Sequence, residues 1–207
     1  MPKVAAITLT FNRLELTKQM VEAFYKMTSV DYHLFIDNGS TDGTREWIVD
    51  KYDHVLFEKN MGIAYAFASA VKSIEGYDFI LKLDNDVVPV TDDIVNKMLK
   101  FYESNNMMFV ASPTDLLLDK NFAPHSISKA RLNGYNVEYV THTGGAFQLI
   151  PIEVCKKLCD DYRHLRQGDY AIGKFFIKMG YRPVYLRDLE MKHIGLNQST
   201  PGNLYKM

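Results

Sequence analysis

Two aspartates, Asp84 and Asp86, stand one residue apart where carboxylates could bind a metal ion. They follow an apolar run, residues 79–83, that is interrupted only at Lys82 and is typical of a strand covered on both faces. In open α/β sheets, ligands bind at the carboxyl ends of strands. Two carboxylates this close together can both reach one hard divalent cation through oxygen. A solvated turn is the alternative interpretation, because Asp and Asn are also common turn residues.

The chain before these aspartates alternates between strand and helix patterns. Residues rich in β-branched and aromatic types predict strands at 3–10, 32–36 and 54–57. Helical spacing predicts helices at 14–27, 45–51 and 63–74. Polar loops, FNR, DNGSTDGT and EKNMG, follow the three strands. This alternation predicts the α/β class, with a doubly wound, mostly parallel central sheet flanked by helices.

The second half of the chain is less regular. We expect helices at 94–102, 152–159 and 169–179, and strands at 107–111, 139–151 and 183–186. The pair Gly144-Gly145 within the strand pattern indicates a bulge or a place where a ligand approaches the backbone. Residues 112–138 lose periodicity, and we interpret them as a long irregular stretch with a functional role.

Composition limits the classes of protein that the chain can be. Its 207 residues are 47% hydrophobic, which is enough for one sizeable core and predicts a single domain over 1–207. A net charge of -1 gives no global attraction to nucleic acid or to an anionic membrane. Without a signal-peptide pattern or an apolar run of about 20 residues, we expect a soluble, cytoplasmic chain with no integral membrane segment. Cys155 and Cys159 have no partner for a metal site and are expected to be reduced core residues.

Five segments taken in order resemble the glycosyltransferase family 2 and its relatives with the glycosyltransferase A-type fold. These segments are ITLTFNR, FIDNGSTDGT, EKNMGIAYAFASA, LKLDNDVVP and GGAFQLIP, and the carboxyl-terminal QGDYAIGKFFIKMGYRPVYLRDLEMKHIG continues the likeness. The resemblance implies a metal-dependent transfer of a sugar from a nucleotide-diphosphate donor to an acceptor hydroxyl. It further implies that residues 1–90 bind the donor, while 91–207 carry the acceptor side and the catalytic group.

The resemblance also assigns roles at the donor side. A Mn²⁺ or Mg²⁺ ion would neutralise the departing diphosphate. Its ligands would be Asp86, Asp84 and His193, although Asp84 could contact the ribose or the sugar and a lone histidine is often structural. The nucleotide pocket would comprise Thr10, Phe11, Arg13, Asp37, Gly62, Asp84 and Gly145. Asp37 would contact the nucleobase, or alternatively serve as a loop residue that caps the next helix. Asp42 is the more natural cap.

Asp169 is the candidate catalytic base of an inverting reaction. The family places an acidic pair at the start of this late helix, whereas this chain has Gly168-Asp169 and lacks the first carboxylate. A helix amino terminus favours the ionised form of an aspartate, which is also the purely structural explanation for its position.

Other functions remain open on the sequence alone. A nucleotidyltransferase also places carboxylates at a sheet edge, but it would typically need a glycine-rich, basic phosphate loop after the first strand. A non-catalytic sugar-nucleotide-binding domain is the third alternative. For the enzyme, we expect a UDP-sugar before a GDP- or dTDP-sugar, and a glycan or glycoprotein acceptor before a nucleic acid.

Overall fold

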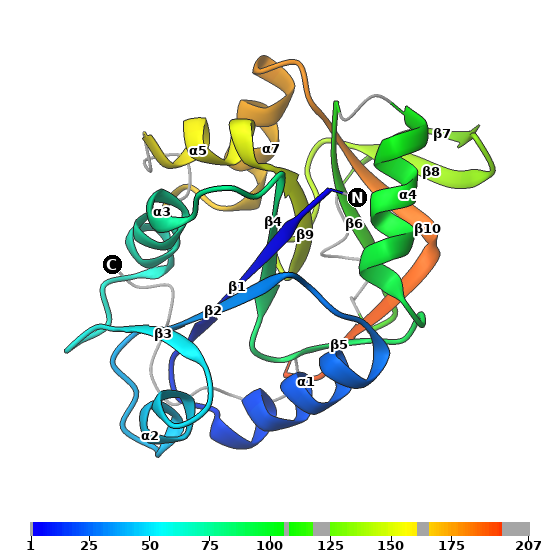
Figure 1. Ribbon diagram of the computed structural model, residues 1–207. Helices are drawn as coiled ribbons and strands as arrows, with labels where there is room; N and C mark the ends of the chain where they lie inside the picture. The colour runs from blue at the N-terminus through cyan, green and yellow to red at the C-terminus, as the bar shows by residue number, and fades with distance from the viewer. Residues whose placement is uncertain (1, 106–107, 118–124, 161–165, 196–207) are drawn as a thin grey trace.

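The computed structural model describes residues 2–105, 108–117, 125–160 and 166–195 (Figure 1). One mixed sheet runs through the molecule, and helices cover both of its faces. The side chains of α1 and α4 pack in one apolar cluster and those of α3, α5 and α7 in another. The expected α/β class with a mostly parallel sheet between helices is confirmed.

The amino-terminal half of the sheet is parallel. Its strands lie in the order β3-β2-β1-β4, with bounds β1 Val4–Thr10, β2 Tyr32–Asp37, β3 Asp53–Leu56 and β4 Phe79–Asp84. The helices between them are α1 Leu14–Met27, α2 Thr44–Val49 and α3 Ile63–Ser73. These elements follow the sequence prediction closely, because each strand except the exposed edge strand β3 is mainly apolar and buried on both faces.

The carboxyl-terminal half brings in antiparallel pairs. Strand β9 lies between β4 and β6 and is antiparallel to both, while β10 is parallel to β6 and antiparallel to β5 and β8. The strands are β5 Val87–Pro89, β6 Phe109–Asp115, β7 Ser126–Leu132, β8 Tyr135–Val140, β9 Phe147–Pro151 and β10 Arg182–His193. The helices are α4 Ile94–Asn105, α5 Ile152–Asp160 and α7 Asp169–Lys178.

The expectation of an irregular stretch over 112–138 is wrong for the described part of that range. Strand β6 continues to Asp115, and β7 and β8 form a hairpin at the end of the sheet. Its turn is Asn133-Gly134, whose φ angles of 45° and 94° are those of the Asn-Gly hairpin turn. Strand β7 has the sequence SISKARL and is mostly exposed, and its few apolar residues do not alternate regularly with polar ones, so no apolar pattern revealed it. Residues 118–124 lie outside the described part.

Two other strand predictions had incorrect boundaries. The expected strand at 139–151 is the end of β8 and the whole of β9, and Gly144-Gly145 lies in the connection between them. The expected strand at 183–186 is the middle of the much longer β10, which carries an irregularity between Leu186 and Glu190. Beyond this irregularity β10 pairs with β5, and that pairing brings the end of β10 to the site described below.

Two smaller expectations concern the cysteines and the membrane. Cys155 and Cys159 are buried free cysteines on α5, as expected. Within the part of the chain that the structure describes, no helix combines the length and apolar character needed to cross a bilayer.

Candidate functional site

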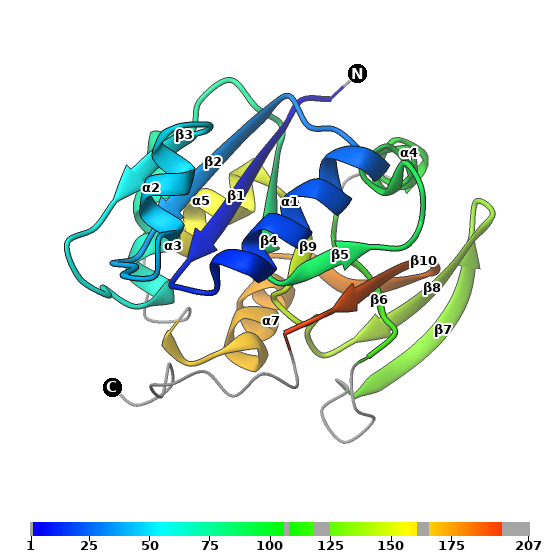
Figure 2. The same cartoon turned by 90° about the horizontal axis from the view of Figure 1, so that it is seen from below.

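Strand register brings the predicted site residues to one edge of the sheet. Thr10 is paired with Asp37, and Asp84 is paired with Leu9, so the carboxyl ends of β1, β2 and β4 are level. His193 reaches the same edge because it is paired with Val87 of β5. Figure 2 shows the end of β1, the start of α1 and helix α7 on the same side of the molecule. This is the edge at which ligands bind in open α/β sheets.

Asp86 lies at the centre of a group of charged side chains. Its carboxylate accepts a hydrogen bond from Arg13 Nη1 at 2.5 Å, and its Oδ1 lies 3.0 Å from His193 Nε2. The side chain of Asp86 is only 5% exposed. Asp115 Oδ2 lies 3.9 Å from the other ring nitrogen of His193. The four side chains come from four separate segments, so the fold assembles this group.

The charges in this group favour one another's ionised forms. Burial alone would raise the pKa of Asp86, but the hydrogen bond and charge of His193, followed by the Arg13 guanidinium, outweigh burial and lower it. Burial alone would lower the pKa of His193, but its hydrogen bond to Asp86 and the charges of Asp86, Asp84 and Asp115 raise it. Gly195 is required here because a Cβ at this position would overlap the Asp86 carboxylate.

Asp86 and His193 have donor atoms suited to a small divalent cation. Neighbouring ligands of an octahedral ion with bonds of 2.0–2.1 Å are about 3 Å apart, and Asp86 Oδ1 and His193 Nε2 are separated by 3.0 Å. Asp84 forms an ion pair of its own. Its Oδ1 lies 2.7 Å from Lys82 Nζ, and within the described residues no group of three or more His, Cys, Asp or Glu side chains is arranged to hold a metal ion. Of the three predicted ligands, Asp86 and His193 are thus a pair of adjacent donors, and Asp84 does not complete a group of three with them.

Asp37 is the last residue of β2 and is fully buried, so it is not the helix-capping loop residue of the alternative interpretation. Its Oδ2 accepts hydrogen bonds from the backbone N–H groups of Gly39 and Ser40 and forms a 3.1 Å ion pair with Arg45 Nε. Its Oδ1 accepts a 3.3 Å hydrogen bond from the Thr10 hydroxyl. The carboxylate thus fixes the loop that follows β2 and links that loop to the end of β1.

Asp42 binds the first residues of two helices, as its predicted capping role requires. Its Oδ1 accepts hydrogen bonds from the Thr44 N–H and hydroxyl, and its Oδ2 accepts one from the Leu14 N–H. Thr44 begins α2 and Leu14 begins α1. Donors at helix amino termini otherwise lack partners, so one aspartate holds the starts of both helices at this edge.

The turn between β1 and α1 has an unusual backbone. Asn12 and Arg13 both have positive φ angles, 58° and 67°, which cost non-glycine residues of order 1–3 kcal/mol each. Asn12 is held by hydrogen bonds to the neighbouring loop, from Thr41 N to its Oδ1 and from its own N to Ser40 Oγ. This conformation is what aims Arg13 at Asp86. Phe11, in the same turn, is half-buried.

Gly62 belongs to a third loop at the same edge. Asn60 Oδ1 accepts hydrogen bonds from the Gly62 N–H and from Asn38 Nδ2, and Asn38 Oδ1 accepts one from the Met61 N–H. The loops after β2 and β3 are therefore joined directly. Backbone groups of the Gly62 segment lie at the amino terminus of α3, where anions are favoured.

Asp169 begins α7 and meets the Gly145 turn. Gly145 donates its N–H to Asp169 Oδ2 at 3.3 Å. The residue as a whole is exposed, but its carboxyl group lies against this turn, and desolvation there raises its pKa. Lys82 and the Gly145 N–H oppose this shift, whereas Asp84 adds to it. Desolvation is therefore the largest influence on the pKa of this carboxyl group.

Three residues of this edge were not singled out as site residues from the sequence. Lys82 bridges Asp84 and the Gly145 carbonyl, and its only signal was the interruption of an apolar run. Asp115 fell in the stretch wrongly expected to be irregular. Tyr185 accepts a hydrogen bond from the Gly144 N–H at 2.9 Å, and burial raises its pKa to about 12. The residue pattern of β10 did not indicate this contact, because the contact depends on the Gly144 turn, which is distant in the sequence.

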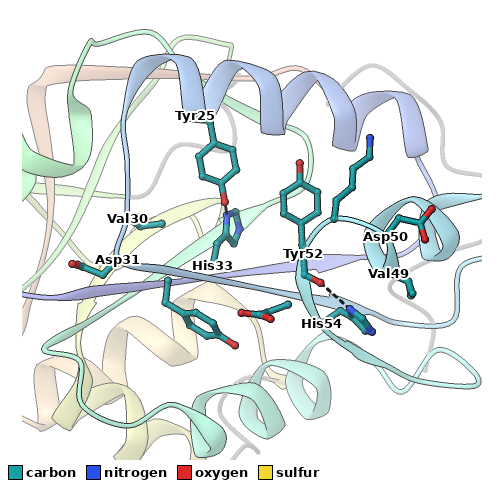
Figure 3. A pocket seen from close by; sticks show the side chains of 11 residues that line it. Tyr25, Val30, Asp31, His33, Val49, Asp50, Tyr52 and His54 are labelled. Atoms are coloured by element: carbon teal, nitrogen blue, oxygen red, sulfur yellow. Dashed lines mark hydrogen bonds between the residues drawn. The ribbon is translucent and has the colours of Figure 1, made fainter.

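A hollow of about 770 Å³ lies at the opposite end of the strands (Figure 3). It is lined by the starts of β2 and β3, including Asp31 and Asp53, together with Tyr25, His33 and Tyr52. Figure 3 shows the Tyr25 hydroxyl directed at the His33 ring. None of the predicted site residues lines this hollow.

Comparison with known proteins identifies the family of the chain. The model of the family "Glycosyl transferase family 2" matches residues 5–157, and the chain belongs to this family. The chain is 34% identical over 83 residues to Glycosyltransferase AglJ of Haloferax volcanii, a match that covers 40% of this chain and 27% of AglJ.

Solved structures with the same fold include two proteins that share little sequence with the chain. Mannosyltransferase PcManGT from Pyrobaculum calidifontis, solved with GDP-Man and Mn²⁺, superposes with a TM-score of 0.68 at 17% identity, over 96% of this chain and 58% of that one. S. aureus TarS 1-349, solved with UDP-GlcNAc, gives 0.67 at 17% identity, over 98% and 63%. The chain spans less than two thirds of each of these three relatives.

Proposed function

We propose that the chain transfers a sugar from a nucleotide-diphosphate donor to an acceptor hydroxyl at the edge formed by β1, β2, β4 and β10. The observation that carries this proposal is the convergence of Asp86, His193 and Arg13 beside Asp84, with Asp169 next to the adjoining Gly145 turn. Membership of the family supports the reaction class. GDP-Man and UDP-GlcNAc in the two similar structures support a nucleotide sugar as the donor.

Asp86 and His193 would hold a Mn²⁺ or Mg²⁺ ion. When bound, such an ion neutralises the charge of the departing nucleoside diphosphate. Arg13 lies on the other carboxylate oxygen of Asp86 and supplies a second positive charge on the donor side. Asp84 faces Lys82 instead, so we assign it to the ribose or the sugar before the metal.

The loops after β1, β2 and β3 would bind the nucleotide, which places the donor site mainly in residues 1–90. Thr10, Phe11 and Gly62 contribute backbone and ring contacts. Asp37 contributes to nucleobase selection by fixing the shape of its loop, because its carboxylate is buried and already accepts several hydrogen bonds.

Asp169 would act as the catalytic base, in the half of the chain that begins at residue 91. It accepts the proton of the acceptor hydroxyl as the acceptor oxygen bonds to the anomeric carbon, while the bond from that carbon to the phosphate oxygen breaks. Its raised pKa suits this role because a stronger base accepts the proton more readily. Direct displacement of this kind inverts the anomeric centre.

Metal-linked donor binding tests the proposal. Thermal unfolding is measured with UDP-GlcNAc or GDP-mannose, with and without Mn²⁺, for the wild type, Asp86→Ala and a control, Asp50→Ala, which changes an exposed aspartate of the opposite edge. A donor at a hundred times its Kd stabilises the native state by about 2.7 kcal/mol. We expect wild type and control to gain stability from donor and Mn²⁺ together, and Asp86→Ala to lose the Mn²⁺-dependent part. Unchanged metal dependence in Asp86→Ala would remove Asp86 from the metal site.

Product analysis separates the alternatives. A glycosyltransferase that hydrolyses its donor slowly releases free sugar and nucleoside diphosphate, whereas a nucleotidyltransferase reaction involves pyrophosphate. Binding without turnover would support a non-catalytic sugar-nucleotide-binding domain. The cytoplasmic location and the glycan or glycoprotein acceptor stay predictions.

A further inference from the structure

Lys82 is a charged residue on a strand that is otherwise apolar or directed to the site. It lies in the middle of β4, and its side chain is 13% exposed. A buried ammonium group is costly unless it is paired and hydrogen-bonded. Lys82 Nζ is 2.7 Å from Asp84 Oδ1 and also donates a short hydrogen bond to the Gly145 carbonyl. The charge is therefore held by partners from two different parts of the fold.

The Gly145 turn joins Lys82 to Asp169. Gly145 accepts a hydrogen bond from Lys82 through its carbonyl and donates its N–H to Asp169 Oδ2. A Cβ on this glycine would lie 3.0 Å from Asp169 Oδ1 and 3.2 Å from Lys82 Nζ. The turn is anchored to β4 once more, because the Asp84 N–H donates to the Ala146 carbonyl at 2.8 Å. The ammonium and the two carboxylates thus surround one short piece of backbone.

Lys82 also affects the ionisation of Asp169, as do other charged groups around that carboxylate. Asp84 disfavours ionisation of Asp169, and Lys82 favours it. His142 also faces Asp169 and favours its ionised form, and Tyr185 approaches from β10. Lys82 is the one of these groups that also binds both Asp84 and the Gly145 turn.

We propose that Lys82 is a positioning residue that couples the donor side of the site, through Asp84, to the acceptor side, through the Gly145 turn and Asp169. Its ammonium group fixes the position of the Gly145 turn, which contacts Asp169. The same positive charge partly neutralises the carboxylates of Asp84 and Asp169. The inference rests on the proposed function for its kinetic consequence, but its structural part stands on the contacts of Lys82 alone.

Two variants of Lys82 and one matched control test this coupling. Lys82→Met keeps an unbranched side chain and removes the charge, Lys82→Arg keeps the charge, and Lys72→Met changes an exposed lysine on α3. The first readout needs no substrate. It is the NMR-detected hydrogen exchange of the Gly145 amide, compared with the amides of Ile80 and Leu81 in the core of β4.

We expect Lys82→Met to speed exchange at Gly145 by about tenfold or more while exchange at Ile80 and Leu81 stays unchanged, because only the turn is released. Lys82→Arg should restore most of the protection, and Lys72→Met should behave as the wild type. Unchanged exchange at Gly145 in Lys82→Met would overturn the proposal. An equal increase at all three amides would also overturn it, because that result indicates a general loss of stability.

Donor hydrolysis is the second readout, with UDP-GlcNAc or GDP-mannose and Mn²⁺. A small misplacement of a catalytic group can cost about 10²-fold in rate, so kcat of Lys82→Met should fall by about 10- to 100-fold with little change in donor KM. A rise in donor KM at wild-type kcat would contradict the coupling. If the wild type hydrolyses neither donor, the proposed function is challenged, and the exchange measurement still decides whether Lys82 positions the turn.

Discussion

The two ends of the parallel strands each hold a histidine, and they do so in opposite ways. At the amino end, His33 Nε2 pairs with the Thr8 hydroxyl and Nδ1 with the Tyr25 hydroxyl, and burial lowers its pKa to about 3. At the carboxyl end, His193 lies against the Asp86 carboxylate, which raises its pKa. His33 is therefore neutral and held by neutral partners, whereas His193 is part of a charged network.

This difference shows why the hollow at the amino end is not the candidate active site. The amino end has a hollow of about 770 Å³, but its buried groups form a hydrogen-bonded, uncharged chain. The carboxyl end carries buried carboxylates, their cationic partners and the positive-φ turn at Asn12 and Arg13. Buried charges and strained backbone are costly and gather where function requires them.

Asp169→Asn is the change with the largest expected effect. Asparagine keeps the shape of the side chain but cannot accept the acceptor's proton. Turnover should fall by about 10²- to 10⁴-fold, with donor affinity nearly preserved. The measurement is kcat for donor hydrolysis together with donor Kd by calorimetry, with Asp160→Asn, an exposed aspartate at the end of α5, as the control. Full activity in Asp169→Asn would show that Asp169 is not the catalytic base.

Asp37→Ala should lower stability more than a substitution in a loop usually does, because Asp37 is fully buried. It removes a buried carboxylate and leaves the partly buried Arg45 without its closest anion. We expect the free energy of unfolding to fall by about 2–3 kcal/mol, measured by urea denaturation. Asp37→Asn, which keeps one acceptor oxygen, should lose less. Wild-type stability with weakened donor affinity in Asp37→Ala would instead indicate a direct nucleobase contact.

His33 should make the protein sensitive to acid. Its pKa is about 3 in the folded state and 6.5 as the ordinary value, so between these pH values the unfolded state binds the additional proton. The His33 contribution therefore lowers stability as pH falls from about 6.5 toward about 3, with a slope of about 1.4 kcal/mol per pH unit. Urea denaturation at pH 7, 6, 5 and 4 should show a shallower loss for His33→Gln. The exposed His54→Gln should match the wild type, and an equal slope in His33→Gln would show that His33 is not neutral in the fold.

Tyr25→Phe should have the smallest effect. It removes the hydroxyl that pairs with His33 Nδ1 but keeps the aromatic ring. A net hydrogen bond is worth about 0.5–1.5 kcal/mol, so unfolding should become easier by that amount at pH 7. Donor binding should be unchanged, because the hollow is at the other end of the strands. A loss of donor affinity would show that the two ends are coupled.

The sequence predicted the fold best where apolar residues repeat at the spacing that a helix or a buried strand requires. Helix α1, predicted at 14–27, has those bounds in the structure because its apolar residues repeat at helical spacing. The β7–β8 hairpin was missed because β7 is an exposed edge strand, and its remaining signal was the Asn133-Gly134 turn. Long-range pairing also determined the length of β10, and no local pattern contains that information.

The candidate site was predictable in its residue types but not in its contacts. Motif order indicated Asp86, Asp169 and His193, and the structure places the first and last of these side by side. The burial of Asp37 was not predictable, because it depends on Arg45 reaching back from the next helix. The partner of Asp84 is Lys82, two residues earlier on the same face of β4. The second partner of Lys82, the Gly145 carbonyl, comes from a distant part of the sequence and was not predictable.

The stereochemistry of donor cleavage tests the central claim most directly and needs no knowledge of the acceptor. An α-linked donor, UDP-GlcNAc or GDP-mannose, is hydrolysed with Mn²⁺, and ¹H NMR records the anomeric proton of the released sugar before it mutarotates. Attack by a water molecule that gives its proton to Asp169 should release the β-anomer first. Initial release of the α-anomer would contradict direct displacement with Asp169 as the base.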